Sequence, residues 1–426
     1  MKISYVLPAY WPAIGGCELH THELVGRLSE RHEIKVITQI TSQEDKPDDL
    51  WIGTLTRPTS RKERYSDGKA QVIPVALTGG ERCLLRPFAR YHHRAPEISM
   101  SVIQRIFLPK ILTHVRDSSL IHCVHNGASF YACAALACAR KLGIPFVFTP
   151  LLQINQALRD KAPQRDEWRN GRSTVLPGSI GSYLVPGSYH DQFWLKAARA
   201  ADALISMTSF EKEFLLGEGI PAGRIHEVGV GPLLSGTHDG TAFRNARGIG
   251  NEDMVLFLGR KHPAKGLEEV LAATARVWEK KPGVRFVFVG PKEGNAAEIF
   301  RRYDDPRIVE IDRVELEEKT SAIEACDIFC MPSFFEALGG VFLEAWSFEK
   351  PVIAGNTSAL RELTEEGRGG FLVNLDPADI AEKIIRLLDD PALRRRMGMW
   401  GRQKVESQYS WDVIAAKVEN VYRQLV

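Results

Sequence analysis

The feature that most constrains the fold is an apolar run of strand length that passes directly into a glycine pair and a helical pattern. Residues 327–332 read DIFCMP, and residues 333–345 read SFFEALGGVFLEA. We interpret them as a buried strand, a short loop and a helix that starts at about Leu338. Amides at a helix start have no carbonyl partners, and with the aligned peptide dipoles they favour an anionic or polyhydroxylated ligand. The stretch therefore predicts an α/β sheet with a binding loop at the end of a strand.

Two carboxylates flank this glycine pair, and their spacing suits one elongated ligand. Glu336 lies in the predicted loop and Glu344 in the predicted helix. Eight residues of helix span about 12 Å, so the carboxylates cannot share one small group but can hold two parts of a long one. A nucleotide sugar has that length. Two glutamates on one helix are also common on a solvated face, so this pair alone leaves both interpretations open.

A second element of the same kind lies upstream. Residues 255–266 read VLFLGRKHPAKG, which indicates a buried strand followed by a cationic loop. A helical period follows, with its apolar positions at Leu267, Val270, Leu271, Thr274 and Val277 or Trp278. In an open α/β sheet ligands sit outside the carboxyl ends of the strands, so we expect both loops to open onto one crevice. An arginine fork at Arg260 and a lysine point charge at Lys265 suit a diphosphate there.

Together the two motifs resemble those of the family-4 retaining glycosyltransferases of the GT-B fold. That family carries G-R-x4-K-G and then, about seventy residues later, E-x7-E. In this sequence the first motif runs from Gly259 to Gly266, and the second from Glu336 to Glu344. The resemblance implies a fold of two Rossmann-like domains that face each other across a cleft.

The same resemblance suggests where the domains begin and end. We expect residues 1–232 plus 408–426 to form an acceptor-side domain with a returning C-terminal helix. Residues 245–407 would form the domain that binds the nucleotide sugar. Residues 232–251 contain several glycines and few large apolar side chains, so we expect the linker there. Residues 41–69 are polar and charged, and we expect them to form a loop.

Roles for individual residues follow from the resemblance. Arg260 and Lys265 would stabilise the leaving diphosphate, Glu336 would contact the donor sugar, and Glu344 would bind ribose hydroxyls. The other donor-binding positions implied are Gly15, Gly16, Val314, Ala337, Leu338, Gly339 and Gly340, and His125 is a further candidate at the end of a strand. The family requires neither a covalent nucleophile nor a metal, so we expect no cofactor besides the nucleotide sugar.

The favoured function is transfer of a hexose-type sugar, with retention, from a nucleoside diphosphate sugar to a hydroxyl of a glycan, lipid or small-molecule acceptor. A sugar-nucleotide epimerase of the same architecture is one alternative. A catalytically degenerate scaffold that binds nucleotide sugar is another, because Leu151 and Leu152 stand where many members place a histidine. Product analysis without acceptor separates the first two.

Charge and cysteine content limit the kinds of partner and the cellular compartment that we expect. The 426 residues include 55 Lys and Arg against 53 Asp and Glu, a balance that does not favour a nucleic-acid partner. The seven cysteines form no C-x-x-C pair, which indicates reduced thiols. Residues 1–8 read MKISYVLP, an apolar strand without the pattern of a cleaved leader, and we expect a cytoplasmic protein.

One basic segment has a composition that is compatible with membrane contact. Between residues 82 and 116, seven Lys and Arg side chains interleave with large apolar ones such as Leu84, Phe88 and Tyr91. Such a segment can lie on the anionic inner face of a membrane, meet an acidic acceptor, or form an ordinary solvated helix face.

Overall fold

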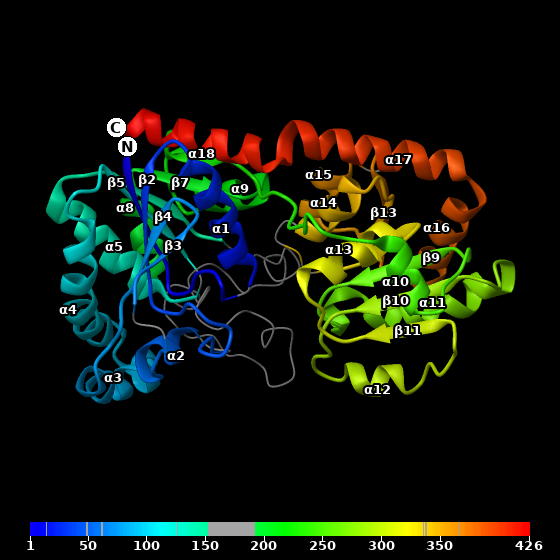
Figure 1. Cartoon of the computed structure of the whole chain (residues 1–426), viewed down its shortest axis with the longest axis horizontal. Helices are drawn as coiled ribbons and strands as arrows, with labels where there is room; N and C mark the ends of the chain where they lie inside the picture. Colours follow the sequence, from blue (N-terminus) through cyan, green and yellow to red (C-terminus); the bar gives the residue numbers. More distant parts are fainter. Residues whose placement is uncertain are drawn as a thin grey trace. The chain divides into compact units, whose positions relative to one another are not determined.

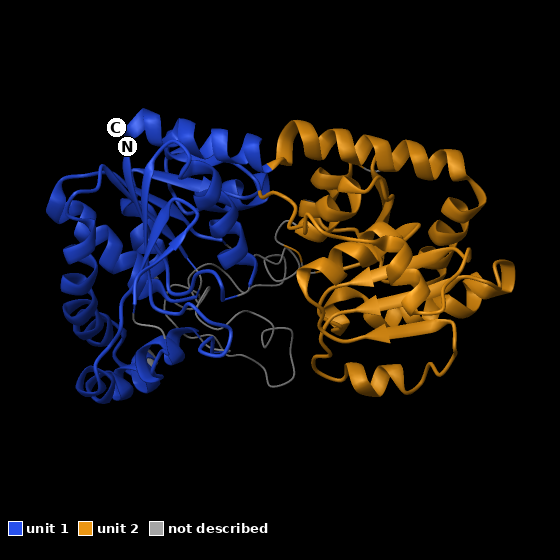
Figure 2. Ribbon diagram, in the orientation of Figure 1, with its two compact units in different colours: residues 1–153, 158–229, 411–426 blue, residues 154–157, 230–410 orange. Residues whose placement is uncertain are grey.

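The computed structural model describes residues 1–13, 15–47, 50–60, 63–125, 127–151, 192–334, 336, 339–365 and 367–426. They form two compact α/β units (Figure 2). Unit 1 contains the described residues up to Gly229 together with Trp411–Val426, and unit 2 contains those of Val230–Ser410. The predicted fold class is confirmed, since both units are built on a parallel sheet flanked by helices (Figure 1).

Unit 1 has an eight-stranded sheet in the order β3-β4-β2-β1-β5-β6-β7-β8. Its pairs are parallel except for the antiparallel pair of β3 with β4. The strands are β1 Lys2–Val6, β2 Glu33–Thr38, β3 Tyr65–Asp67, β4 Ala70–Pro74, β5 Leu120–Val124, β6 Phe146–Thr149, β7 Ala203–Ser206 and β8 Ile225–Glu227. The helices are α1 Gly16–Leu28, α2 Leu50–Thr56, α3 Gly79–Tyr91, α4 Pro96–Val115, α5 Ser129–Leu142, α8 Gln192–Ala200, α9 Ser209–Gly217 and α18 Trp411–Leu425.

Unit 2 has a six-stranded parallel sheet in the order β11-β10-β9-β12-β13-β14. The strands are β9 Met254–Leu258, β10 Arg285–Val289, β11 Ile308–Ile311, β12 Ile328–Met331, β13 Val352–Gly355 and β14 Gly370–Val373. The helices are α10 Gly240–Ala246, α11 Leu267–Lys280, α12 Ala296–Phe300, α13 Leu316–Ala325, α14 Gly340–Ser347, α15 Ser358–Thr364, α16 Pro377–Asp389 and α17 Pro391–Lys404. Residues of β9 and β12 are all buried, as expected for central strands covered on both faces.

Each sheet reverses its winding at one place. In unit 2 the chain moves outward from β9 through β10 to β11, and then restarts at β12 beside β9. In unit 1 the corresponding restart is at β5 beside β1. Loops that leave the carboxyl ends of the two strands at such a switch point diverge and open a crevice. The loops after β9 and β12 therefore border the natural ligand position of unit 2.

The terminal helix α18 is part of unit 1. Its buried face includes Ile414, Val418 and Val421, three of the apolar positions that recur at helical spacing. The hydroxyl of Tyr422 lies 2.6 Å from the hydroxyl of Tyr5 on β1, and both side chains are fully buried. A buried polar pair of this kind fixes the position of the helix on the sheet because neither hydroxyl can turn to water instead.

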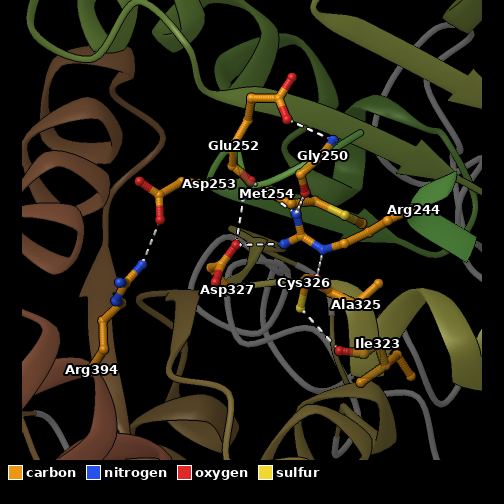
Figure 3. A network of polar contacts seen from close by, with 10 residues as sticks. All are labelled: Arg244, Gly250, Glu252, Asp253, Met254, Ile323, Ala325, Cys326, Asp327 and Arg394. Carbon is orange, nitrogen blue, oxygen red and sulfur yellow. Dashed lines mark hydrogen bonds and ion pairs between the residues drawn. The ribbon is translucent and has the colours of Figure 1, made fainter. Parts of the chain in front are cut away.

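The prediction that residues 232–251 form a linker is wrong. They belong to unit 2 and contain α10, which packs against α13. Figure 3 shows the cause: the Arg244 guanidinium of α10 donates to the carbonyls of Ala325, Gly250 and Glu252 and to the Asp327 carboxylate at 2.8 Å. These contacts hold α10 at the amino ends of β9 and β12, at the edge opposite to the loops that leave those strands. A hollow of ≈ 390 Å³ beside Arg244 lies at that edge.

The expectation of a loop at residues 41–69 is also wrong in part. The described residues there include α2 and β3, and β3 pairs with β4 as an added edge strand. Trp51, Leu55 and Thr54 of α2 are buried, so this segment contributes to the core. The helix is only seven residues long and lies within a polar, charged stretch, so its few apolar residues do not form an extended helical period.

Candidate functional site

The loop after β9 positions the two predicted phosphate-binding cations differently. Gly259 has φ 149°, a conformation open to glycine alone, and the loop ends at Gly266 with φ 74° before α11 begins. The Arg260 side chain is 55% exposed, and its guanidinium lies 3.1 Å from the Glu293 carboxylate. The Lys265 side chain is only 14% exposed. Arg260 can therefore reorient at little cost, whereas Lys265 is fixed.

The loop after β12 lies directly against the loop after β9. The amide of Phe334 donates to the carbonyl of Ala264 at 3.2 Å. The ammonium of Lys265 forms an ion pair with the Glu336 carboxylate, which is 12% exposed. The structure thus brings together the cationic motif and the first glutamate of the acidic motif, as the crevice argument predicts, although they are 71 residues apart in the sequence.

The helix that follows begins later than predicted. It starts at Gly340, and Gly339 precedes it with φ 74° and ψ 54°. A Cβ on Gly339 would lie 2.6 Å from the Phe342 ring, so this position requires glycine for space as well as for backbone angle. The spacing of about 12 Å counted all eight residues from Glu336 to Glu344 as helix, and it does not apply because the helix begins only at Gly340. Ala337 and Leu338, both predicted to bind donor, lie outside the described residues.

Glu344 lies in the middle of α14 and is only 3% exposed. Its Oε1 accepts from the Lys319 ammonium at 2.8 Å and from the Leu233 amide at 3.3 Å. Its Oε2 is buried and has no hydrogen-bond partner among the described residues. A carboxylate oxygen desolvated without a donor is costly, so this atom is suited to accept a hydrogen bond from a ligand hydroxyl.

Lys261 is a functional-site neighbour that the sequence did not reveal. Its side chain is fully buried, and its ammonium donates to Glu310 Oε1 at 2.7 Å and to the carbonyl of Ile311 at 2.9 Å. Burial lowers the pKa of Lys261, while Glu310 opposes that shift. The pair ties the loop after β9 to β11, the outer strand. Val314, predicted to bind the donor, follows β11 and packs against the unit 2 core.

The predicted residues of unit 1 lie on both sides of its switch point. Gly15 precedes α1 with extended backbone, and a side chain there would collide with Glu18 and Lys46, which form an ion pair at 3.0 Å. Gly16 is exposed, with open space where a Cβ would lie. Both glycines follow β1. Gly16 therefore leaves the backbone at the start of α1 open to close approach, whereas the Glu18–Lys46 pair fills the space beside Gly15.

His125 follows β5, the other strand of the unit 1 switch point. It is 3% exposed, and its Nδ1 lies 3.2 Å from the carbonyl of Pro150. Its Nε2 is buried without a hydrogen-bond partner among the described residues. Burial lowers the pKa of His125 to about 4, so the ring is neutral near neutral pH. A neutral ring with one nitrogen fixed can offer the other to a ligand.

These two units, each with a parallel sheet and a switch-point loop pair, define the GT-B class of fold. Sucrose-phosphate synthase from Thermosynechococcus elongatus has this fold and superposes with a TM-score of 0.69 at 18% identity, over 100% of this chain and 98% of that one. Residues 15–231 match the protein family described as "Glycosyl transferase 4-like domain", and residues 252–390 match the family described as "Glycosyl transferases group 1". The chain belongs to this family of glycosyltransferases.

Curated relatives narrow the comparison further. A GDP-mannose-dependent monoacylated α-(1-6)-phosphatidylinositol monomannoside mannosyltransferase of Corynebacterium glutamicum is 29% identical over 266 residues, 58% of this chain and 66% of that protein. A phosphatidyl-myo-inositol mannosyltransferase of Mycobacterium tuberculosis is 32% identical over 179 residues, 39% of this chain and 46% of that protein. The chain thus spans about half to two thirds of the length of the curated relatives it matches.

Proposed function

We propose that the chain is a retaining glycosyltransferase that moves a hexose-type sugar from a nucleoside diphosphate sugar to a hydroxyl acceptor. The observation that carries the proposal is the joined loop pair of unit 2. Arg260 and Lys265 follow β9, Glu336 and Glu344 follow the neighbouring β12, and Lys265 contacts Glu336 directly. The segments that leave these two neighbouring strands thus carry two cations, a helix start and a buried carboxylate oxygen without a partner among the described residues. These groups match the parts of a nucleotide sugar.

The proposed reaction breaks the bond between the anomeric carbon and the diphosphate oxygen and forms a bond from that carbon to the acceptor oxygen. The acceptor proton passes to the departing diphosphate, on the face from which the new bond forms. Arg260 and Lys265 stabilise the negative charge that grows on the diphosphate, which is where preorganised cations lower a barrier most. Glu344 holds the ribose and Glu336 the sugar, so neither acts as a nucleophile, and no metal takes part.

The test is a binding screen followed by product analysis. UDP, GDP and ADP, with their sugars, would be screened by thermal shift, since a ligand at a hundred times its Kd stabilises by about 2.7 kcal/mol. GDP-mannose and inositol-based acceptors come first, because the Corynebacterium relative is named as GDP-mannose-dependent and both mannosyltransferases are named for phosphatidylinositol-based acceptors. We expect an α-linked donor to give an α-linked product by proton NMR. Isomerised sugar nucleotide without acceptor would identify an epimerase, and binding without turnover would identify a scaffold.

We further propose that the protein is cytoplasmic and contacts the anionic inner face of a membrane through α3 and α4. Among the described residues, no helix has the length and apolar character needed to span a bilayer. Arg82 and Lys110 of the basic segment are engaged within unit 1, by the Leu77 carbonyl and the Glu81 carboxylate. The rest of the segment still exposes both kinds of side chain that peripheral binding needs: Leu84, Tyr91 and Ile98, with Arg86, Arg90 and Arg94.

Vesicle sedimentation tests this contact. We expect binding to vesicles that contain phosphatidylglycerol and little binding to pure phosphatidylcholine. Changing Leu84 and Tyr91 to Ser should release the protein from the anionic vesicles. Equal sedimentation with both lipids, or no effect of the double variant, would contradict the proposal.

A further inference from the structure

A histidine–carboxylate pair in unit 1 has no part in the function proposed above. Nδ1 of His22, on α1, lies 2.7 Å from Oδ2 of Asp67, the last residue of β3. The hydroxyl of Tyr10, whose side chain is fully buried, donates to the same Oδ2 at 2.6 Å. The Asp67 side chain is 14% exposed and that of His22 28% exposed. The carboxylate is thus enclosed, while part of the imidazole reaches the surface.

The contacts of Asp67 determine which nitrogen of His22 carries the proton. Burial raises the pKa of Asp67, but hydrogen bonds from His22 and Tyr10 outweigh it, and the net shift is downward. An ionised carboxylate only accepts, so Nδ1 of His22 must donate to it. In the neutral ring Nε2 then has a free lone pair. Nε2 has no hydrogen-bond partner among the described residues, and unlike Nε2 of His125 it is not sealed from solvent.

An aromatic side chain lies against the same imidazole. The ring of Trp11 stacks on that of His22 with centroids 4.8 Å apart and planes 24° from parallel. The backbone of Trp11 is held as well, because its carbonyl accepts from the hydroxyl of Tyr65. Trp11 is partly exposed. A rigid aromatic surface beside a preset hydrogen-bond acceptor is the usual makeup of a site for a ring with both C–H and O–H groups.

We propose that Trp11 and Nε2 of His22 form a subsite for a polyhydroxylated ring of the acceptor, with Asp67 and Tyr10 as the residues that orient the imidazole. A hydroxyl suits this atom better than a phosphate does. Nε2 offers a lone pair to a hydroxyl, and the Asp67 carboxylate places a negative charge close to any anion that would bind there. This inference rests on the proposed function only in naming the ligand an acceptor.

The position of His22 on α1 sets the part of the acceptor that it meets. Gly15 and His22 are seven residues apart, so they lie on one face of the helix about 10 Å from each other. If the reacting hydroxyl lies near Gly15, His22 contacts a second ring of the acceptor. A distal contact of this kind should change acceptor affinity and leave the chemical step almost unaltered.

Two substitutions separate ligand binding from structural support. The amide nitrogen of asparagine takes the place of Nδ1, so His22→Asn keeps the bond to Asp67 and removes Nε2. Glutamine places its amide where Nε2 lies, so His22→Gln keeps the reach to the ligand. The control is His32→Gln, which keeps the bond of His32 to Glu419, because that bond is made by Nε2 at 3.0 Å in the same unit and the side chain is only 8% exposed.

We expect His22→Asn to raise the acceptor KM by roughly three- to tenfold, the range for one hydrogen bond, with kcat, donor KM and melting temperature almost unchanged. His22→Gln should recover most of the loss, and His32→Gln should leave the acceptor KM unchanged. An unaltered acceptor KM in His22→Asn would mean that the pair only ties β3 to α1, and the proposal would be wrong.

A second measurement does not depend on transfer. The protein labelled with ¹⁵N-histidine would be titrated with methyl α-D-mannopyranoside, with myo-inositol, and with phosphatidylinositol in detergent micelles. We expect the Nε2 resonance of His22, assigned through His22→Asn, to move and saturate while that of His32 stays fixed. A response to the micelles alone indicates a lipid-linked ring, and a response to the free rings indicates a soluble acceptor. No response to any of the three overturns the subsite, whereas absence of transfer with every nucleotide sugar overturns only the proposed function.

Discussion

The most direct test of the donor orientation is the change Glu344→Gln. Glutamine keeps one oxygen, which can still accept from Lys319 and Leu233 as Glu344 Oε1 does at 2.8 and 3.3 Å. Its amide group replaces Oε2, the oxygen that has no partner among the described residues. The substitution therefore puts a donor where a ribose hydroxyl is expected to donate. It leaves the other contacts of the side chain in place.

The size of the effect follows from the charge of the lost acceptor. A hydrogen bond to a charged group contributes about 1.5 to 3 kcal/mol, so the Kd for a nucleoside diphosphate should rise roughly 10- to 150-fold. The ribose is unchanged during transfer, so the loss should fall on nucleotide binding and donor KM. Glu336→Gln should behave in the opposite way. It should still bind the nucleoside diphosphate but lose turnover, because the sugar gains positive charge at its anomeric centre in the transition state.

Calorimetry with UDP, GDP and ADP measures the affinities, beside steady-state transfer for both variants. Removing the ribose hydroxyls from the ligand should weaken binding to the wild type but not to Glu344→Gln, a coupling that identifies the contact. Glu211→Gln is the control, because Glu211 is a 2% exposed glutamate of unit 1 that accepts from the Met207 amide. If Glu344→Gln binds all three nucleotides as tightly as the wild type, or if Glu336→Gln abolishes nucleotide binding, the proposed orientation is refuted.

Three further outcomes are expected. Transfer should persist in EDTA because arginine and lysine supply the positive charge at the diphosphate; loss of turnover that magnesium or manganese restores would contradict this. Ending the chain before Tyr409 should lower the melting temperature of unit 1, because it removes the buried bonds of the Tyr422 hydroxyl to Tyr5 and His122; an unchanged melting profile would refute it. Stability should fall below pH 6.5, since burial lowers the pKa values of His20, His122 and His125 to about 4, 3 and 4. At lower pH the unfolded chain binds protons at these histidines that the folded chain does not. Between pH 7.5 and 5.5 this lowers the free energy of unfolding by about 1.4 kcal/mol per histidine, or about 4 kcal/mol for all three. Thermal melts across this range, compared with His→Gln variants, measure it.

The parts of the fold that the sequence predicted are those with an unambiguous local signal. The run at β9 is continuously apolar, and the helix after it buries Leu267, Val270, Leu271, Thr274 and Val277 as its period indicated. Helix α1 departs further from a simple apolar pattern. Cys17 is only partly buried, while Glu18 and His20 are buried. Glu18 pairs with Lys46, and the ring of His20 packs against Trp411.

What the sequence could not predict are contacts between residues far apart in the chain. Glu344 and Lys319 are 25 residues apart, and His22 and Asp67 are 45 apart. No spacing rule relates such pairs, since their approach depends on strand order and on which face of a sheet each side chain occupies. The burial of Lys261 was hidden for the same reason. Its partner Glu310 lies on β11. The alternation of strands and helices along the sequence does not show that β11 lies close to the loop after β9.

The pairing of charges around the crevice assigns different tasks to the two cations. Arg260 forms an ion pair with Glu293, and Lys265 forms one with Glu336. The formal charges of these four side chains therefore sum to zero. An exposed ion pair contributes at most about 1 kcal/mol, and Arg260 can exchange Glu293 for a phosphate at that cost. Lys265 is largely buried, and its ammonium has three donors, so it can keep Glu336 and also meet a diphosphate. Under the proposed function we therefore expect Lys265 to hold Glu336 in place beside the diphosphate and Arg260 to supply the charge that responds to the ligand.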